Sequence, residues 1–135
     1  MITMFDSISV TALPSGNDYA YAGYVNGSWP DYNTIKTKFP DSHVLSITIN
    51  ASGKADCLDV ETGDATVAQV AAWTASRLAA GAMRPVLYAS VSLMSAVIRQ
   101  IQMSSIGSLD LVRIWTAHYG TGEHICGPGT CRQLA

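Results

Sequence analysis

Two acidic residues lie two positions apart at the end of a segment with the composition of a buried strand. Residues 55–64 read Ala-Asp-Cys-Leu-Asp-Val-Glu-Thr-Gly-Asp. In an extended strand, Asp59 and Glu61 would point to the same face, about 6.6 Å apart. Cleavage of a glycosidic bond uses two acids, one to protonate the leaving oxygen and one to stabilise or attack the anomeric carbon. Like charges this close raise the pKa of one partner, so the sequence indicates a candidate catalytic pair.

The same segment also has a purely structural interpretation. Asp-x-Glu is a common tripeptide, and residues 62–66 can form a solvated turn followed by a helix cap. Glu61 is, however, one of only two glutamates in the chain, the other being Glu123. Its position at a strand end therefore favours catalysis without excluding the structural alternative.

Length and composition exclude several classes of protein. The 135 residues suit one domain with its own core, and 48 % hydrophobic against 13 % charged residues indicates a globular chain. The net charge is −2 and the lysines and arginines are scattered singly, which argues against nucleic acid as a partner. The first residues do not have the pattern of a signal peptide, so we expect none, and no apolar run approaches the roughly 20 residues of a membrane span.

The three cysteines fall into two kinds. Cys126 and Cys131 flank a Gly-Pro-Gly turn and could form a disulfide, whereas Cys57 lies within a strand and is expected to be a buried free thiol. His118 and His124 do not have zinc-finger spacing. We therefore expect neither a metal nor a cofactor.

Short strands alternate with helices along the chain. The pattern predicts strands at 3–10, 20–25, 43–50, up to Glu61, 84–90 and 109–119. It predicts helices from Pro30 and Asp31 to Lys38, from a cap near Asp64 or Thr66 to Gly81, and at 92–103. Such alternation is typical of an α/β fold with a parallel sheet.

In the third strand, apolar and polar side chains alternate. Leu45, Ile47 and Ile49 share one face, and Ser46, Thr48 and Asn50 share the other. We expect the first face to meet helices and the second to line a polar interior or cleft.

Two parallel architectures remain, a doubly wound sheet and part of a (β/α)-barrel of TIM type. No glycine-rich phosphate loop follows the first strand, which argues against a nucleotide fold. Acids and aromatics instead collect at the carboxyl ends of several strands, where barrels carry their active sites: Asp6, Asp59, Glu61, Tyr88, Trp115 and Tyr119. The barrel is therefore favoured.

Four segments together resemble glycoside hydrolase family 25, the lysozyme (N-acetylmuramidase) family, and related actinobacterial and phage glycoside-hydrolase-like domains. They are Phe5-Asp6-Ser7, Leu58-Asp59-Val60-Glu61, Val86 to Ser90, and Trp115 to Tyr119. The resemblance implies a variant (β/α)-barrel acting on bacterial cell-wall peptidoglycan.

The resemblance also implies roles for individual residues. Glu61 would be the general acid, with Asp59 and Asp6 supporting the oxocarbenium-like state or positioning an acetamido group. Tyr88, Trp115 and Tyr119 would line the sugar site. Two alternatives stay open: Asp6 as a buried acid satisfied by backbone donors, and Trp115 as a core residue.

Residues 1–135 supply about six strands, so the barrel is expected to be incomplete, truncated before a seventh strand. We expect the open sheet to be covered by self-association, a virion partner or a missing C-terminal segment. The alternative function is a catalytically silent barrel that binds cell wall or serves as a phage capsid or tail module. Either function would place the protein at the cell wall or in a virion.

Overall fold

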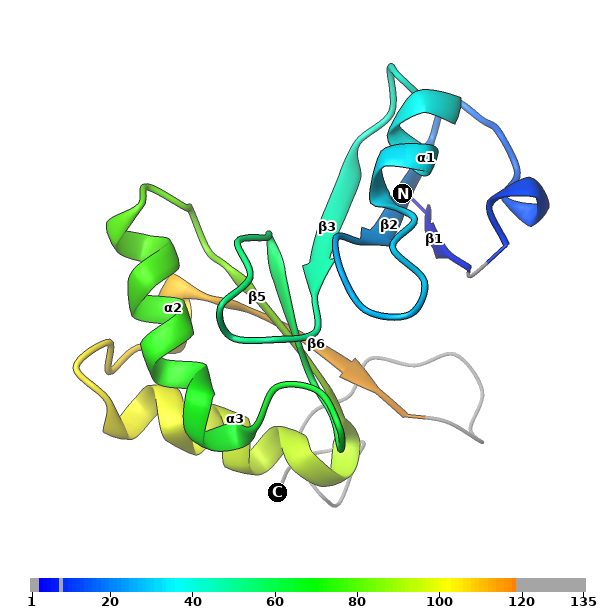
Figure 1. Cartoon of the computed structure of the whole chain (residues 1–135). Helices are drawn as coiled ribbons and strands as arrows, with labels where there is room; N and C mark the ends of the chain where they lie inside the picture. Colours follow the sequence, from blue (N-terminus) through cyan, green and yellow to red (C-terminus); the bar gives the residue numbers. More distant parts are fainter. Residues whose placement is uncertain (1–2, 8, 119–135) are drawn as a thin grey trace.

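The computed structural model describes residues 3–7 and 9–118, and these form the predicted α/β fold (Figure 1). In chain order the elements are β1 (Thr3–Asp6), β2 (Tyr19–Tyr24), α1 (Tyr32–Lys38), β3 (Val44–Thr48), β4 (Cys57–Val60), α2 (Val70–Ala79), β5 (Val86–Ser90), α3 (Val91–Met103) and β6 (Arg113–Ala117). Single 3-10 turns at Val10–Ala12, Val67–Gln69 and Leu109–Leu111 complete this order.

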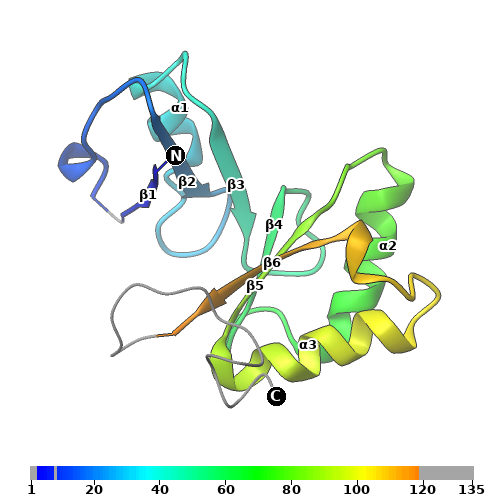
Figure 2. The ribbon, with the colours of Figure 1, turned by 180° about the vertical axis from the view of Figure 1, so that it is seen from behind.

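All six strands are parallel and follow one another across the sheet in the order β1-β2-β3-β4-β5-β6. A doubly wound sheet would instead grow in both directions from a central strand. The sheet curls along its width, with α1 beside β2 and β3, and α2 and α3 beside β4 to β6 (Figure 2). The described chain is thus a curled, half-barrel-like sheet, as expected for an incomplete barrel.

The largest core lies between the outer face of β4 and β5 and the helices α2 and α3. Leu58 and Leu87 project from the strands and are fully buried against helical side chains such as Trp73, Met94 and Ile101. A second core holds α1 against β2 and β3, where the ring of Tyr21 stacks on Phe39 with 3.9 Å between centroids. These two cores fix the strand ends that carry the site.

The inner, concave face has a smaller apolar cluster of Ala22, Ile47, Cys57 and Val86. Cys57 is fully buried and is a free thiol, as predicted. Its neighbours in this cluster come from β2, β3 and β5, so the inner face is filled at its centre.

The two faces of β3 are the reverse of the prediction. Leu45 and Ile47 pack on the concave cluster and do not meet helices, whereas Ser46 and Thr48 lie on the opposite face. On that face α1 packs against Val44 at the start of β3, and no helix follows β3, because residues 49–56 lead directly to β4. Ser46 instead exchanges hydrogen bonds with Asp56, donating from its amide and hydroxyl to the carboxylate and accepting from the Asp56 amide.

Some strands and helices are shorter in the structure than the sequence pattern predicts. The predicted strand 109–119 begins with a 3-10 turn, and its extended part runs over Arg113–Ala117. Thr66, one of two predicted caps, forms a reciprocal capping box with Gln69, and a 3-10 turn precedes the regular helix α2.

None of the helices within residues 3–7 and 9–118 has the length and apolar content needed to cross a bilayer.

The connection between β3 and β4 is anchored at Gly53, and this anchor sets the position of β4. The indole of Trp73 donates a hydrogen bond to the Gly53 carbonyl at 2.9 Å. A Cβ at residue 53 would overlap the hydroxyl of Thr48 and lie 2.7 Å from its Cβ, with the Asn26 amide at 3.1 Å. A side chain here is therefore sterically excluded.

We predict that Gly53→Ala lowers the free energy of unfolding by about 1–3 kcal/mol, because the new methyl group must displace Thr48 or the loop. Urea denaturation followed by far-UV circular dichroism measures this change. Lys54→Ala, at an exposed neighbouring position, is the control and should change little. Equal stability of the two variants would show that residue 53 has room for a side chain.

Candidate active site

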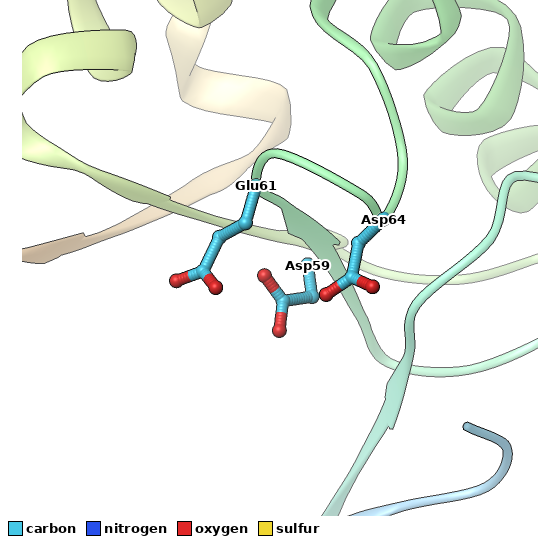
Figure 3. A group of neighbouring side chains, drawn as sticks. All are labelled: Asp59, Glu61 and Asp64. Carbon is cyan, nitrogen blue, oxygen red and sulfur yellow. The ribbon is translucent and has the colours of Figure 1, made fainter. Parts of the chain in front are cut away.

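Three carboxylates converge at the carboxyl end of β4. Asp59 lies on β4, Glu61 directly follows the strand, and Asp64 lies in the turn beyond it. One oxygen from each lies within 4.8 Å of one from each of the others. Figure 3 shows the three side chains directed toward a common space. The structure thus brings together Asp59 and Glu61, and it adds Asp64, which the sequence indicated only as a cap.

Asp59 is the buried member of this group. It is 2 % exposed, and its Oδ2 accepts a hydrogen bond from the hydroxyl of Tyr24 at 3.0 Å. Its Oδ1 is buried without a hydrogen-bond partner among the described residues. Desolvation, and then the charge of Glu61, raise the pKa of Asp59 to about 7, while the hydrogen bond from Tyr24 opposes the rise.

The acids face a cleft of about 290 Å³. Its lining residues come from β2, from β4 and from the loops that follow β2, β3 and β4: Tyr24, Asn26, Gly27, Ser28, Trp29, Ile49, Asp59, Glu61 and Asp64. None of these lining residues is Lys, Arg or His. The negative charge must therefore be reduced by protons or by a cation from solution.

This arrangement has two chemical capabilities. Two acids with unlike burial can hold one proton between them, which is the condition for acid–base catalysis near neutral pH. Three carboxylate oxygens within 4.8 Å of one another are also a donor set that a hard divalent cation could use. Asp59, Glu61 and Asp64 are the described residues that could hold such an ion.

Two aromatic residues in the cleft were not singled out from the sequence. Tyr24 is the last residue of β2, and Trp29 lies in the following loop with 61 % of its surface exposed. A signal for both was present, because the strand-end rule applied to the other strands also holds for β2. Trp29 offers a large aromatic face beside the acids.

Two of the predicted sugar-binding aromatics lie on the concave face beside Asp59 but are not among the residues that line this cleft. Asp59 is paired with Tyr88, and Tyr88 with Trp115, across β4, β5 and β6. The rings of Tyr88 and Trp115 meet edge to face at 4.9 Å, and both pack on the concave cluster. The predicted Tyr119 lies outside the described residues, as do Cys126 and Cys131.

Asp6 ends β1, and β2 and β3 separate this strand from β4. It is exposed, so the alternative of a buried acid satisfied by backbone donors is wrong. Partial desolvation and the charge of Asp31 raise its pKa. Asp6 does not line the cleft, but its charge contributes to the raised pKa of Asp59.

The burial of Asp59 predicts how stability depends on pH. Its pKa is 3.8 ordinarily and about 7 in the fold, so between these values the folded state holds a proton that the unfolded state releases. The free energy of unfolding therefore falls as pH rises through this window. An asparagine side chain at this position mimics the protonated acid and removes the effect.

We predict that the free energy of unfolding of Asp59→Asn, relative to that of the parent chain, rises by roughly 2–4 kcal/mol when the pH is raised from 4 to 8. Chemical denaturation at both pH values measures the gain. Asp41→Asn, at an exposed acid, is the control. A stability difference for Asp59→Asn that stays constant with pH would contradict the raised pKa.

Comparisons of the chain with protein-family models, with curated proteins and with solved structures find no match. The resemblance to glycoside hydrolase family 25 therefore stays a prediction. The geometry of the cleft is the basis on which a function can be proposed.

Proposed function

We propose that this chain is a (β/α)-barrel domain of TIM type, resembling glycoside hydrolase family 25, that cleaves the glycan of bacterial cell-wall peptidoglycan. Glu61 is the general acid and Asp59 assists it. The observation that carries the proposal is the pairing of a buried and a partly exposed carboxyl group in one cleft. The sequential order of the parallel strands supports the barrel.

The unlike burial of the two acids divides their roles. Asp59 is covered, whereas Glu61 is partly exposed and can reach a glycosidic oxygen in the cleft. Because the pKa of Asp59 is about 7, the pair keeps one proton near neutral pH. The pair therefore carries the proton that cleavage requires, and Glu61 is the member placed to pass it to the glycosidic oxygen.

The spacing of the two acids supports a reaction that retains the anomeric configuration. Their nearest oxygens lie within 4.8 Å. Retaining glycosidases have carboxyl groups about 5–5.5 Å apart, whereas inverting enzymes need about 6.5–9.5 Å to fit a water molecule. The unpartnered Oδ1 of Asp59 can accept a hydrogen bond from the N–H of a substrate acetamido group once a small local movement exposes it.

Aromatic faces in and beside the cleft suit the apolar faces of pyranose rings. Trp29 and Tyr24 line the cleft itself, and we assign them to the sugar at the reacting bond. Tyr88 and Trp115 extend an aromatic surface along the concave face, where they would contact the neighbouring part of the glycan. Asp6 would add negative potential from β1.

A specific observation also favours the second candidate, a catalytically silent module that binds cell wall or forms part of a phage capsid or tail. Asp6, Tyr88 and Trp115 do not line the cleft that contains Glu61. Groups that act as a unit lose activity steeply when one is missing. Such a module would bind glycan without cleaving it.

We predict that Glu61→Gln lowers turnover of peptidoglycan by about 100-fold or more, because the amide keeps the shape but has no proton to donate. Loss of turbidity of a peptidoglycan suspension measures turnover, and circular dichroism checks folding. Asp18→Asn, at an exposed acid outside the cleft, is the control.

If the unmutated chain leaves several peptidoglycans intact, that result would contradict the proposed enzymatic activity. Sedimentation with insoluble peptidoglycan then tests the second candidate. Binding without turnover would support the silent module, and the absence of both would refute the cell-wall assignment.

We predict that Trp29→Ala raises KM for a soluble peptidoglycan fragment on the order of tenfold while kcat changes less, because a stacking surface is lost. Trp29→Phe should restore most of the affinity. Met103→Ala removes another exposed apolar side chain, far from the cleft, and should leave both constants unchanged. An unaltered KM for Trp29→Ala would show that this ring does not contact sugar.

A further inference from the structure

A second pocket, of about 250 Å³, lies at the opposite end of the sheet, where β3 to β6 begin. Its lining includes Arg77, Arg84 and Arg113, together with His43, Leu45 and Asp56. Three of the five arginines in the chain are in this set, although they are far apart in sequence. The fold thus gathers cationic groups that appeared scattered.

Two of these arginines are held in place by backbone carbonyls. Arg77 donates from Nε to the carbonyl of Ala55 at 3.0 Å, and Arg84 donates from Nη2 to the carbonyl of Val112 at 3.2 Å. A guanidinium group has five N–H donors, so each retains several for a ligand. Because they are already oriented, binding would cost little side-chain entropy.

The third arginine, Arg113, lines the same pocket from β6. Arg113 is the first residue of this strand and pairs with Val86 on β5. Val86 belongs to the concave cluster, so Arg113 lies on the concave side of the sheet at its amino-terminal end. The pocket is therefore approached by arginines from the end of α2, from the loop before β5 and from β6.

The acid in the pocket, Asp56, is hydrogen-bonded to Ser46 and does not pair with any of these arginines. The Oδ2 of Asp56 accepts hydrogen bonds from the amide and hydroxyl of Ser46, at 3.0 and 2.9 Å. Within residues 3–7 and 9–118, no ion pair joins Asp56 to Arg77, Arg84 or Arg113. Three arginines and one aspartate leave a formal charge of about +2, not counting His43.

The backbone of Arg84 supplies an independent observation. Its φ is 57°, and it is the one non-glycine residue with positive φ among the described residues. This conformation is strained for a side chain other than glycine and is typically retained at functional positions. Placing an arginine here aims its side chain at the pocket in spite of that strain.

We propose that this pocket binds a phosphate dianion, either free inorganic phosphate or a small phosphate monoester. A dianion matches the local charge of the pocket, and planar guanidinium groups bind the oxygens of phosphate in pairs. The volume accepts a phosphate and a small organic group beside it, with Leu45 and Met83 as apolar contacts. The site is independent of the acidic cleft and of the glycosidase proposal.

The test is isothermal titration calorimetry of the full chain with inorganic phosphate, and separately with glycerol 1-phosphate. We expect saturable binding of at least one of them, with a Kd below about 1 mM. Tighter binding of the ester would identify a monoester as the ligand, and equal or weaker binding would identify free phosphate.

Arg84→Gln and Arg113→Gln should each weaken binding about tenfold, because each removes charge-assisted hydrogen bonds. Arg84→Gly should weaken it equally while remaining folded, since glycine relieves the positive φ. Arg99→Gln, at an exposed arginine of α3 outside the pocket, is the matched control and should bind like the parent chain. Absence of saturable binding of both ligands, or equal weakening by Arg99→Gln, would overturn the proposal.

Discussion

The burial of the Asp59 carboxyl group, with a single hydrogen bond from Tyr24, is the constraint on which the candidate site depends. A carboxylate removed from water must be compensated by hydrogen bonds, by a counter-charge or by a proton. The cleft offers one hydrogen bond and no basic side chain, and Glu61 adds a second negative charge. The pair is therefore arranged to hold a proton at neutral pH.

The fold supplies this constraint through two strands, β2 and β4, that flank β3 in a sequential parallel sheet. β2 positions Tyr24, β4 positions Asp59, and the loop from β3 to β4 is fixed at Gly53 by Trp73. The same sheet places negatively and positively charged side chains at its opposite ends. Acids gather where the strands end, and arginines gather where β3 to β6 begin.

The features that could be predicted from sequence are those governed by local periodicity. The two-residue period of a strand was enough to place Asp59 and Glu61 on one face, and Thr66 was recognisable as a cap. The surroundings of the two faces of β3 could not be assigned this way. Which face meets helices depends on the elements that pack against the strand, and the alternation of side chains does not reveal these. Here Asp56, in the loop before β4, accepts hydrogen bonds from Ser46, and Asn26, in the loop after β2, donates one to Thr48.

The sequence also could not predict how far apart residues on different strands lie across the sheet. Asp6 shares a strand-end position with Asp59, but two strands lie between them. Arg77, Arg84 and Arg113 meet because α2 and the beginnings of β5 and β6 converge, which spacing along the chain does not reveal. Trp29 lies beside the acids of β4 although it follows β2, two strands away in the sheet.

The raised pKa of Asp59 is tested most directly by titrating its side-chain carboxyl carbon with carbon-13 nuclear magnetic resonance of the folded chain. We expect a midpoint near pH 7, because desolvation and the charge of Glu61 raise the pKa of Asp59 to about 7. A midpoint near its ordinary value of 3.8 would show that the carboxyl group is solvated or paired with a cation. The proton on which the proposed acid–base pair depends would then be absent at neutral pH.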